Sequence, residues 1–153
     1  ELIYVPSFYN EMALISKQRE KLGWTDVVVM GPGSLYSPKL LELGGNSVNG
    51  LYTSAVFFPN DPRPEVQKFV KGFEAKYKAT PNMFAAVAYD AINLMAETIR
   101  KVGTDRKAIR DELVKTKNFP GVTGKITFTE RRDVIKEYRH LVVKDGQFTL
   151  YDK

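Results

Sequence analysis

The chain has 153 residues, a length that suits one ordinary domain or part of a larger protein. Hydrophobic residues make up 43% and charged residues 27%, as in most soluble globular proteins, and no apolar run approaches the roughly 18 residues of a membrane span. The absence of cysteine excludes disulfides and thiolate chemistry, and the single histidine, His140, disfavours a histidine metal site or a Ser-His-Asp triad.

The net charge is +5, but Lys and Arg are interleaved with Glu and Asp along the chain. The densest basic cluster is Arg131-Arg132. We interpret this pattern as a solvated surface rather than a nucleic-acid interface, because mixed charges are typical of soluble surfaces. The sequence starts at Glu1, inside an expected strand and without an initiator Met, which favours a processed or partial chain.

The first third of the chain alternates strand-like and helix-like patterns. A buried strand is expected at residues 2–5, and Asn10 is the expected N-cap of a helix that ends at Gly23. Ser37 followed by Pro38 predicts the start of a short helix. The other expected elements in this part are a strand at 26–30, a loop at 31–38 and a strand at 51–58.

After residue 58 the polar, proline-rich segment PNDPRPE breaks the pattern, and the chain becomes helical. A helix with the apolar stripe Val66, Phe69, Val70, Phe73 and Tyr77 comes first. Two more helices, one short strand and a hairpin are then expected. They are a helix from Pro81-Asn82 with Phe84, Ala88, Ala91, Met95 and Val102 on one side, a helix capped by Thr104, a strand at 125–129, and a hairpin at 138–151 turning at Asp145-Gly146.

This order predicts an α/β fold, an open sheet with helices on both faces. Ligands of such sheets bind beyond the carboxyl ends of the strands. Two loops occupy that position, Ser7-Phe8-Tyr9 after the first strand and residues 31–36 after the second. Because the two strands are consecutive, we expect these loops to lie side by side.

The sequence carries no convincing catalytic or cofactor motif. GPGSLY has Tyr36 where a dinucleotide fingerprint needs its third glycine, and GVTGK has the wrong spacing for a phosphate-binding loop, so we expect a structural turn there. No carboxylate lies in either strand-end loop. We interpret Glu97 and Lys101, four residues apart, as an ion pair on a helix surface. We therefore expect no catalytic residue, no metal and no cofactor, and we expect a binding protein rather than an enzyme.

Four segments carry a family resemblance. YVPSFYNEMALISKQREKLGW, GPGSLYSPKLLELGGNSVNGLY, NMFAAVAYDAINLMAETI and FPGVTGKITF together resemble the substrate-binding proteins of branched-chain amino acid ABC transporters, which are type I periplasmic binding proteins. The resemblance covers nearly the whole chain but only the C-terminal part of the family's length. It implies an αβα sandwich of two lobes that close on a small solute.

The resemblance also implies how the chain is divided and where it acts. Residues 1–56 and the hairpin at 136–153 would belong to the second lobe, and residues 57–135 to the first. The implied partners are an amino acid or related organic acid as ligand and the membrane permease of an ABC transporter, with no nucleic acid. The implied location is periplasmic or extracellular, lipid-anchored or soluble. A fragment of this kind is also expected to associate with itself or with the missing N-terminal part, since its apolar faces are uncovered.

Candidate ligand-binding residues can be carried over by position. Phe8 matches an aromatic that covers the ligand, and Phe84 matches one that contacts the ligand side chain. Tyr9 could either pack or bind, and Ser34 and Tyr36 are weaker candidates from the second loop. Gly33 stands where the family has an acid that holds the ligand's ammonium group. A residue elsewhere then replaces that acid, or the ligand lacks an amino group, because an unpaired buried ammonium is costly.

Two readings other than a transport protein remain open at this stage. The same fold also serves as the ligand-sensing ectodomain of receptors, which a membrane span or signalling domain in the parent gene would indicate. A basic nucleic-acid-binding domain is the remote alternative, which a salt-dependent shift of DNA would support. The turn Glu130-Arg131-Arg132-Asp133 also departs from the family's Asn-Gly type of turn, and we expect it to alter only the surface charge.

Overall fold

The computed structural model describes residues 1–151, which fall into two compact units. Unit 1 combines Glu1–Ala55 with the residues from Tyr138 on, and unit 2 is Val56–Glu137. The chain therefore leaves unit 1 once and returns to it once. None of the helices among these residues combines the length and hydropathy that crossing a bilayer would require.

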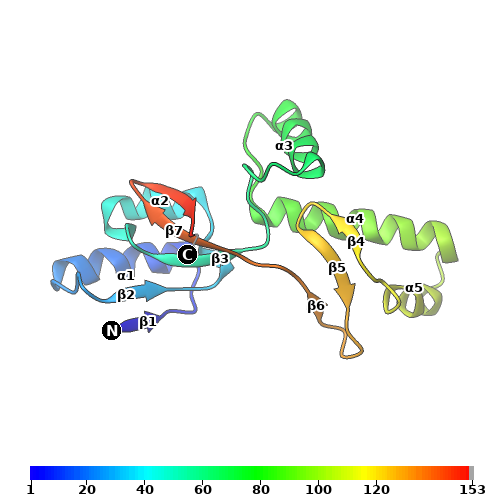
Figure 1. Cartoon of the computed structure of the whole chain (residues 1–153), viewed down its shortest axis with the longest axis horizontal. Helices are drawn as coiled ribbons and strands as arrows, with labels where there is room; N and C mark the ends of the chain where they lie inside the picture. Colours follow the sequence, from blue (N-terminus) through cyan, green and yellow to red (C-terminus); the bar gives the residue numbers. More distant parts are fainter. Residues whose placement is uncertain (152–153) are drawn as a thin grey trace. The chain divides into compact units, whose positions relative to one another are not determined.

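Unit 1 is a five-stranded sheet with two helices (Figure 1). The strand order is β1-β2-β3-β7-β8; β1, β2 and β3 run parallel, whereas β7 pairs antiparallel with both β3 and β8. Its elements, with η marking 3-10 turns, are β1 (Leu2–Tyr4), α1 (Tyr9–Lys21), β2 (Val28–Met30), η1 (Gly33–Leu35), α2 (Pro38–Gly44), η2 (Gly45–Val48), β3 (Tyr52–Ala55), β7 (Arg139–Lys144) and β8 (Gln147–Leu150).

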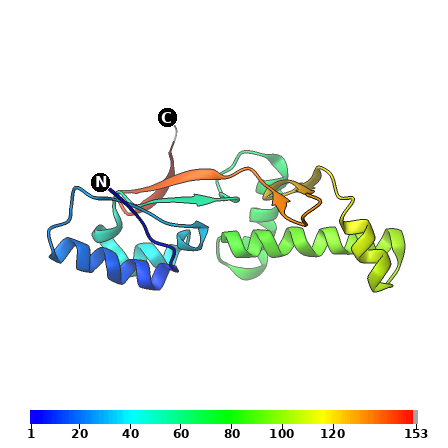
Figure 2. The same cartoon turned by 90° about the horizontal axis from the view of Figure 1, so that it is seen from below.

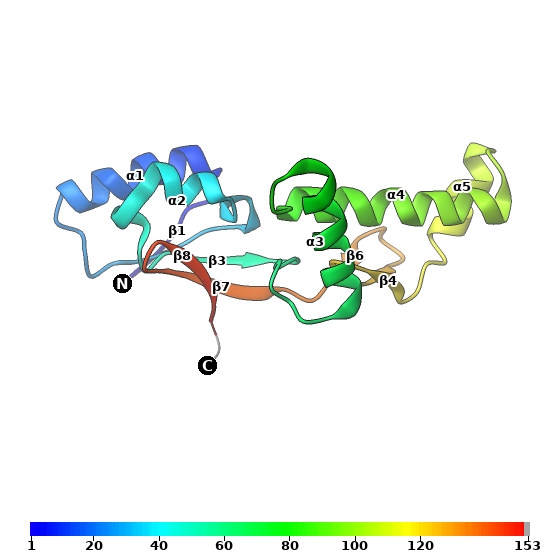
Figure 3. The ribbon, with the colours of Figure 1, turned by 90° about the horizontal axis from the view of Figure 1, so that it is seen from above.

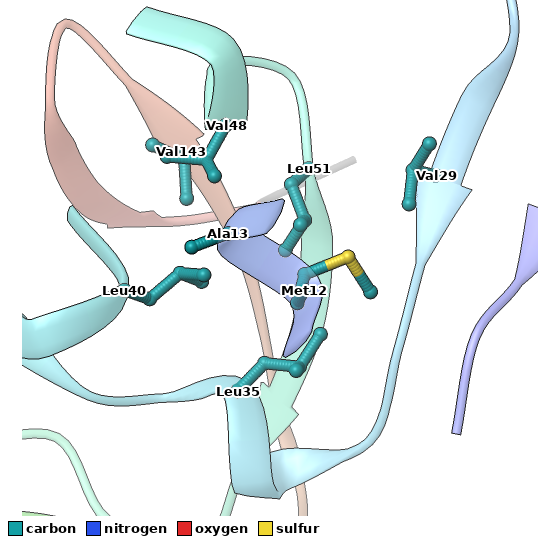
Figure 4. Close-up of a cluster of buried hydrophobic side chains, with 8 residues drawn as sticks. All are labelled: Met12, Ala13, Val29, Leu35, Leu40, Val48, Leu51 and Val143. Atoms are coloured by element: carbon teal, nitrogen blue, oxygen red, sulfur yellow. The ribbon is translucent and has the colours of Figure 1, made fainter. Parts of the chain in front are cut away.

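Both helices of unit 1 lie on the same face of its sheet, as Figures 2 and 3 show from opposite sides. Met12 and Ala13 of α1 and Leu40 of α2 pack there on Val29, Leu51 and Val143 of the sheet side (Figure 4). We expected helices on both faces. In the described part of unit 1 the expectation holds for one face only, because α1 and α2 both follow their strands to the same side.

The expectation that residues 2–5 form a buried strand is wrong in one respect. β1 forms, but Leu2 and Tyr4 are 57% and 56% exposed. The reason is that β1 is an edge strand and, in the part of the chain that the structure describes, pairs only with β2. The strand expected at 51–58 is also shorter, because β3 ends at Ala55 and Phe57 packs into the core of unit 2.

Two local predictions in unit 1 are confirmed. Ser37 caps α2, its hydroxyl accepting a hydrogen bond from the Lys39 amide, with Pro38 in the first helical position. β7 and β8 form the expected hairpin, and Asp145 and Gly146 both have positive φ, 50° and 71°. This is the geometry of a two-residue type I′ turn, which Asp-Gly favours.

Unit 2 consists of three helices and a small antiparallel sheet, ordered β4-β5-β6. The helix stripe predicted from Val66 is confirmed over its first two turns, where Val66, Phe69 and Val70 are buried. β4 and β6 were not expected from the sequence pattern. The elements of unit 2 are α3 (Pro64–Tyr77), α4 (Met83–Val102), α5 (Arg106–Leu113), β4 (Phe119–Gly121), β5 (Gly124–Phe128) and β6 (Val134–Ile135).

The prediction of which face α4 buries is wrong. The buried residues are Ala86, Asp90, Leu94 and Thr98, spaced four apart, whereas Phe84 and Met95 from the predicted stripe are exposed. α4 carries apolar side chains around most of its circumference. The pattern of polar and apolar residues therefore did not indicate which side of the helix is buried. A polar residue on the buried face, Asp90, is retained because its carboxylate is fully hydrogen-bonded.

Candidate ligand-binding site

The loops that follow β1 and β2 lie side by side, as expected from the order of the strands. The Ser34 hydroxyl donates a hydrogen bond of 2.7 Å to the Ser7 carbonyl oxygen, and the Val5 amide donates one of 2.8 Å to the Met30 carbonyl oxygen. These bonds connect the carboxyl ends of two parallel strands. They create one short surface from two segments that lie 27 residues apart in the sequence.

The second loop is held closely against its neighbours. The Gly31 amide donates to the Tyr52 carbonyl oxygen at 3.0 Å, and the Thr53 hydroxyl donates to the Pro32 carbonyl oxygen at 2.7 Å. A side chain at Gly31 would place its Cβ 2.9 Å from the Val5 carbonyl oxygen, so only glycine permits this approach. The loop expected at 31–38 also contains a turn of 3-10 helix, η1, which begins at Gly33.

Phe8 and Tyr9 occupy different environments although they are adjacent. Phe8 is the N-cap residue of α1 and its side chain is 61% exposed. Tyr9 is the first residue of α1, is half-buried and packs on the core of unit 1. The expectation that Asn10 caps this helix is therefore wrong, because the N-cap is Phe8, two residues earlier, and its side chain makes no capping hydrogen bond.

Ser7 belongs to the first predicted strand-end loop but was not predicted to bind the ligand itself. Its Oγ is buried and has no hydrogen-bond partner among the described residues. A buried hydroxyl of this kind is normally satisfied by protein, water or a ligand. Because serine is common in turns, its identity alone gave no signal, and only its position beside Ser34 and the start of α1 distinguishes it.

The remaining candidates of the second loop differ in accessibility. Tyr36 is nearly buried, and its ring meets that of Phe148 edge to face at 4.9 Å between centroids. Burial raises the pKa of the Tyr36 phenol well above its usual value, so it stays protonated across the physiological range. Gly33 and Ser34 are half-buried and form the first turn of η1.

Phe84 belongs to unit 2. It is the second residue of α4, after the N-cap Asn82, whose side chain accepts a hydrogen bond from the Ala85 amide at 3.0 Å. Its side chain is 49% exposed and so is available for contacts beyond the core of its own unit.

The strand-end surface of unit 1 is suited to binding rather than to proton transfer. Residues 6–9 and 31–37 contain no acid, lysine, arginine or histidine. They offer an exposed aromatic ring at Phe8, hydroxyls at Ser7 and Ser34, and the first amides of α1, whose partial positive charge favours a carboxylate. An apolar surface with a few orienting polar groups is typical of sites for small organic molecules.

Comparison with known proteins places these features in a family. The family model for periplasmic binding proteins matches residues 3–147. A leucine-, isoleucine-, valine-, threonine- and alanine-binding protein of Pseudomonas aeruginosa is 26% identical over 99% of this chain, and the chain spans 38% of that protein's length.

Solved structures show the same similarity. A leucine-binding protein of Thermotoga maritima is 34% identical with a TM-score of 0.89, over 99% of this chain and 43% of its own. A branched-chain amino acid transporter substrate-binding protein of Streptococcus pneumoniae, solved with isoleucine, is 27% identical with a TM-score of 0.85, over 96% of this chain and 42% of its own. The chain therefore spans less than half the length of these relatives. The TM-scores confirm the expected α/β fold.

Proposed function

This chain belongs to the periplasmic binding protein family, and we propose that it is part of an extracytoplasmic solute-binding protein that captures a small amino acid or related organic acid and delivers it to the permease of an ABC transporter. The observation that carries the proposal is the strand-end surface of unit 1, where Phe8, the unpartnered Ser7 hydroxyl and the first turn of α1 come together. The protein acts outside the cytoplasm, in the periplasm or at the cell surface, and performs no catalysis.

The proposed binding mode uses the chemistry of these groups. The ligand carboxylate accepts hydrogen bonds from the first amides of α1 and from the Ser7 hydroxyl. Phe8 covers the apolar part of the ligand. Ser34 orients the Ser7 backbone through its hydrogen bond, and Phe84 stays a candidate ligand contact that the family resemblance implies.

The class of ligand depends on Gly33, which offers no charge for an ammonium group. A calorimetric titration of the full-length protein with leucine, valine and phenylalanine, and with the matching acids that lack the amino group, tests this directly. Tight binding of an amino acid requires an acid from outside residues 1–153 to replace the one absent at Gly33. Binding of the amino-free acids alone means that the substrate class has changed. Binding of neither set contradicts the proposed function.

The adjacent aromatics supply a matched pair of variants. Phe8→Ala is expected to weaken ligand binding by about tenfold or more, since burying a phenyl ring contributes roughly 1.5–3 kcal/mol. Tyr9→Ala is expected to lower the unfolding free energy, by about 2 kcal/mol, because Tyr9 packs on the core. Calorimetry and denaturant unfolding of both variants distinguish the two roles. Equal, negligible losses of affinity would remove Phe8 from the site.

We propose that residues 1–56 and 136–153 belong to one lobe of the full-length protein and residues 57–135 to the other, a division close to that of unit 1 and unit 2. The family match and the short length of the chain relative to its relatives support this assignment. In isolation, the chain is proposed to associate with itself or with the remainder of the protein through its exposed apolar side chains, such as Leu2 and Ile92.

A further inference from the structure

One asparagine in the sequence precedes a glycine, at Asn49-Gly50, between η2 and β3. In such a pair the glycine lacks the side chain that would otherwise hinder attack of its amide nitrogen on the asparagine side chain. An unrestrained asparagine-glycine pair therefore loses ammonia spontaneously in water, and asparagine is accordingly a thermolabile residue. Asn49 is half-buried and Gly50 is exposed, so water reaches the pair.

The reaction needs no reactant other than water. The Gly50 amide nitrogen gives up its proton to hydroxide and forms a bond to the side-chain carbonyl carbon of Asn49. The bond from that carbon to the side-chain nitrogen breaks, the nitrogen takes up a proton, and ammonia leaves. Water then opens the cyclic imide at either of its carbonyl carbons. One opening leaves aspartate at position 49, and the other leaves isoaspartate, in which the main chain runs through the former side chain.

Both reacting groups are engaged in hydrogen bonds with the β7–β8 hairpin. The Gly50 amide donates to the Val143 carbonyl oxygen at 2.8 Å, and the Asn49 side-chain oxygen accepts from the Gly146 amide at 3.2 Å. Val143 belongs to β7, and Gly146 lies in the turn before β8. Ring closure requires the Gly50 nitrogen and the Asn49 side chain to turn toward each other, whereas each is held toward the hairpin.

The residues on both sides of the pair hold its backbone in place. Val48 and Leu51 lie in the core of unit 1, 0% and 2% exposed (Figure 4). The Asn49 amide donates to the Asn46 carbonyl oxygen at 3.0 Å, and the Leu51 carbonyl oxygen accepts from the Val143 amide at 2.9 Å. The pair therefore rearranges only after the contacts of this segment with the hairpin have broken.

We propose that Asn49 is a site of deamidation that the β7–β8 hairpin protects in the folded chain, and that it reacts when the hairpin opens locally. Local opening of this kind occurs in folded proteins without global unfolding. Because deamidation is slow relative to reclosing, its rate follows the equilibrium population of the open form. Isoaspartate at position 49 lengthens the main chain by one carbon, so the Gly50 amide and the Val143 carbonyl lose their register and the modified chain keeps its hairpin open.

The first test compares the 153-residue chain in its native state and in guanidinium chloride, at the same pH and temperature, by mass-spectrometric peptide mapping that separates aspartate from isoaspartate. Deamidation at Asn49 is expected to be at least about tenfold slower in the native state. Hydrogen exchange of the Gly50 amide reports the same opening and is expected to be slowed by the same factor, within about threefold. Equal deamidation rates in the two states would overturn the proposal, and so would a Gly50 amide protected far more strongly than Asn49.

Two variants test whether the hairpin itself provides the protection. Gly146→Ala strains the turn, because alanine disfavours its φ of 71°, but keeps the amide that donates to Asn49. It is expected to speed deamidation at Asn49 by about fivefold or more. Gly23→Ala is the matched control. Gly23 also has a φ of 71°, and among residues 1–151 no atom lies within 4 Å of a Cβ added at either glycine, but Gly23 follows α1.

Gly23→Ala is expected to leave the deamidation rate within about twofold of the parent, because it does not strain the hairpin. Both rates are measured at a temperature where circular dichroism shows each variant to be folded. An unchanged rate in Gly146→Ala would mean that the hairpin does not protect Asn49. Equal acceleration in both variants would mean that unfolding beyond the hairpin limits the reaction. Either result would overturn the proposal.

The consequence of the reaction is measured on its product. The chain with isoaspartate at position 49, separated chromatographically, is expected to exchange the Val143 amide faster than the parent, because its bond to the Leu51 carbonyl oxygen is lost. Asn49→Asp is the control: it keeps the length of the main chain and an acceptor for the Gly146 amide, and slow exchange is expected to persist. Slow exchange in the isoaspartate product would contradict a hairpin that stays open.

Discussion

The buried carboxylate of Asp90 connects two parts of unit 2 by hydrogen bonds. Its carboxylate accepts hydrogen bonds from the Val122 amide at 2.8 Å, from the Thr123 amide at 2.9 Å and from the Thr123 hydroxyl at 2.5 Å. The Thr123 hydroxyl also accepts a hydrogen bond from the Lys136 ammonium. Burial lowers the pKa of Lys136, and the nearby negative charge of Asp90 opposes that shift. One carboxylate thus joins α4 to the β4–β5 hairpin.

The close approach of this carboxylate also explains Gly121. A Cβ there would lie 2.5 Å from the Asp90 Oδ2, so any side chain would displace the carboxylate. The pattern of the sequence did not reveal this contact. Asp90 lies among apolar residues of a helix, and its partners are backbone amides more than 30 positions later, which composition does not mark.

Replacing Asp90 by asparagine tests this arrangement at the scale of one residue. Asp90→Asn keeps the shape but turns an amide donor toward Thr123, whose amide and hydroxyl both need an acceptor. We expect the unfolding free energy to fall by about 2–3 kcal/mol in denaturant titrations. Asp111→Asn on exposed α5 is the control, with an expected change within about 0.5 kcal/mol. A loss for Asp90→Asn no larger than that of the control would contradict the assigned role.

At the scale of elements, the helix starts differ in how well they could be predicted. Ser37 and Asn82 both cap the helices expected of them. α5 differs: the expectation that Thr104 caps it is wrong, because the Asp105 side chain accepts the hydrogen bond of the Ala108 amide at 2.8 Å. Thr104 and Asp105 are adjacent and both are good capping residues, so their order could not be decided from residue type.

The two candidate caps of α5 form a matched experiment. Asp105→Ala is expected to lower the unfolding free energy by about 1 kcal/mol, because the Ala108 amide loses its acceptor and the helix loses a negative charge at its start. Thr104→Ala is expected to change it by less than about 0.5 kcal/mol. Urea unfolding followed by circular dichroism measures both. The reverse order of effects would mean that the cap in solution is Thr104.

At the scale of the whole molecule, both units leave apolar side chains exposed. In unit 1 these include Leu2 and Tyr4 on the edge strand β1, and in unit 2 they include Val87 and Ile92 on α4. Ile92 is 70% exposed. The chain also spans less than half the length of the relatives it matches. Exposed apolar side chains favour association when they gather into large patches.

The proposed self-association is measurable by light scattering. The molar mass of the 153-residue chain is expected to rise with concentration in the micromolar range. Ile92→Glu is expected to reduce that rise, because it places a charge on the exposed apolar face of α4. Asn93→Glu introduces the same charge at an exposed polar neighbour and is expected to leave it unchanged. A constant monomer mass across the series would rule out self-association.

The sequence by itself determined most of the elements and much of their order, although β4 and β6 were not predicted. Local signals act over a few residues, so the Ser37-Pro38 start, the Asp145-Gly146 turn and the α3 stripe could be read directly, and the strand-end rule brought Ser7 and Ser34 together. The family resemblance supplied Phe8 and Phe84 as candidates. Only the tertiary structure decided which face of α4 is buried, that β1 is an exposed edge, and that the Ser7 hydroxyl has no hydrogen-bond partner within residues 1–151. Each of these depends on which distant residues pack nearby, and helix period and residue type contain no information about such contacts.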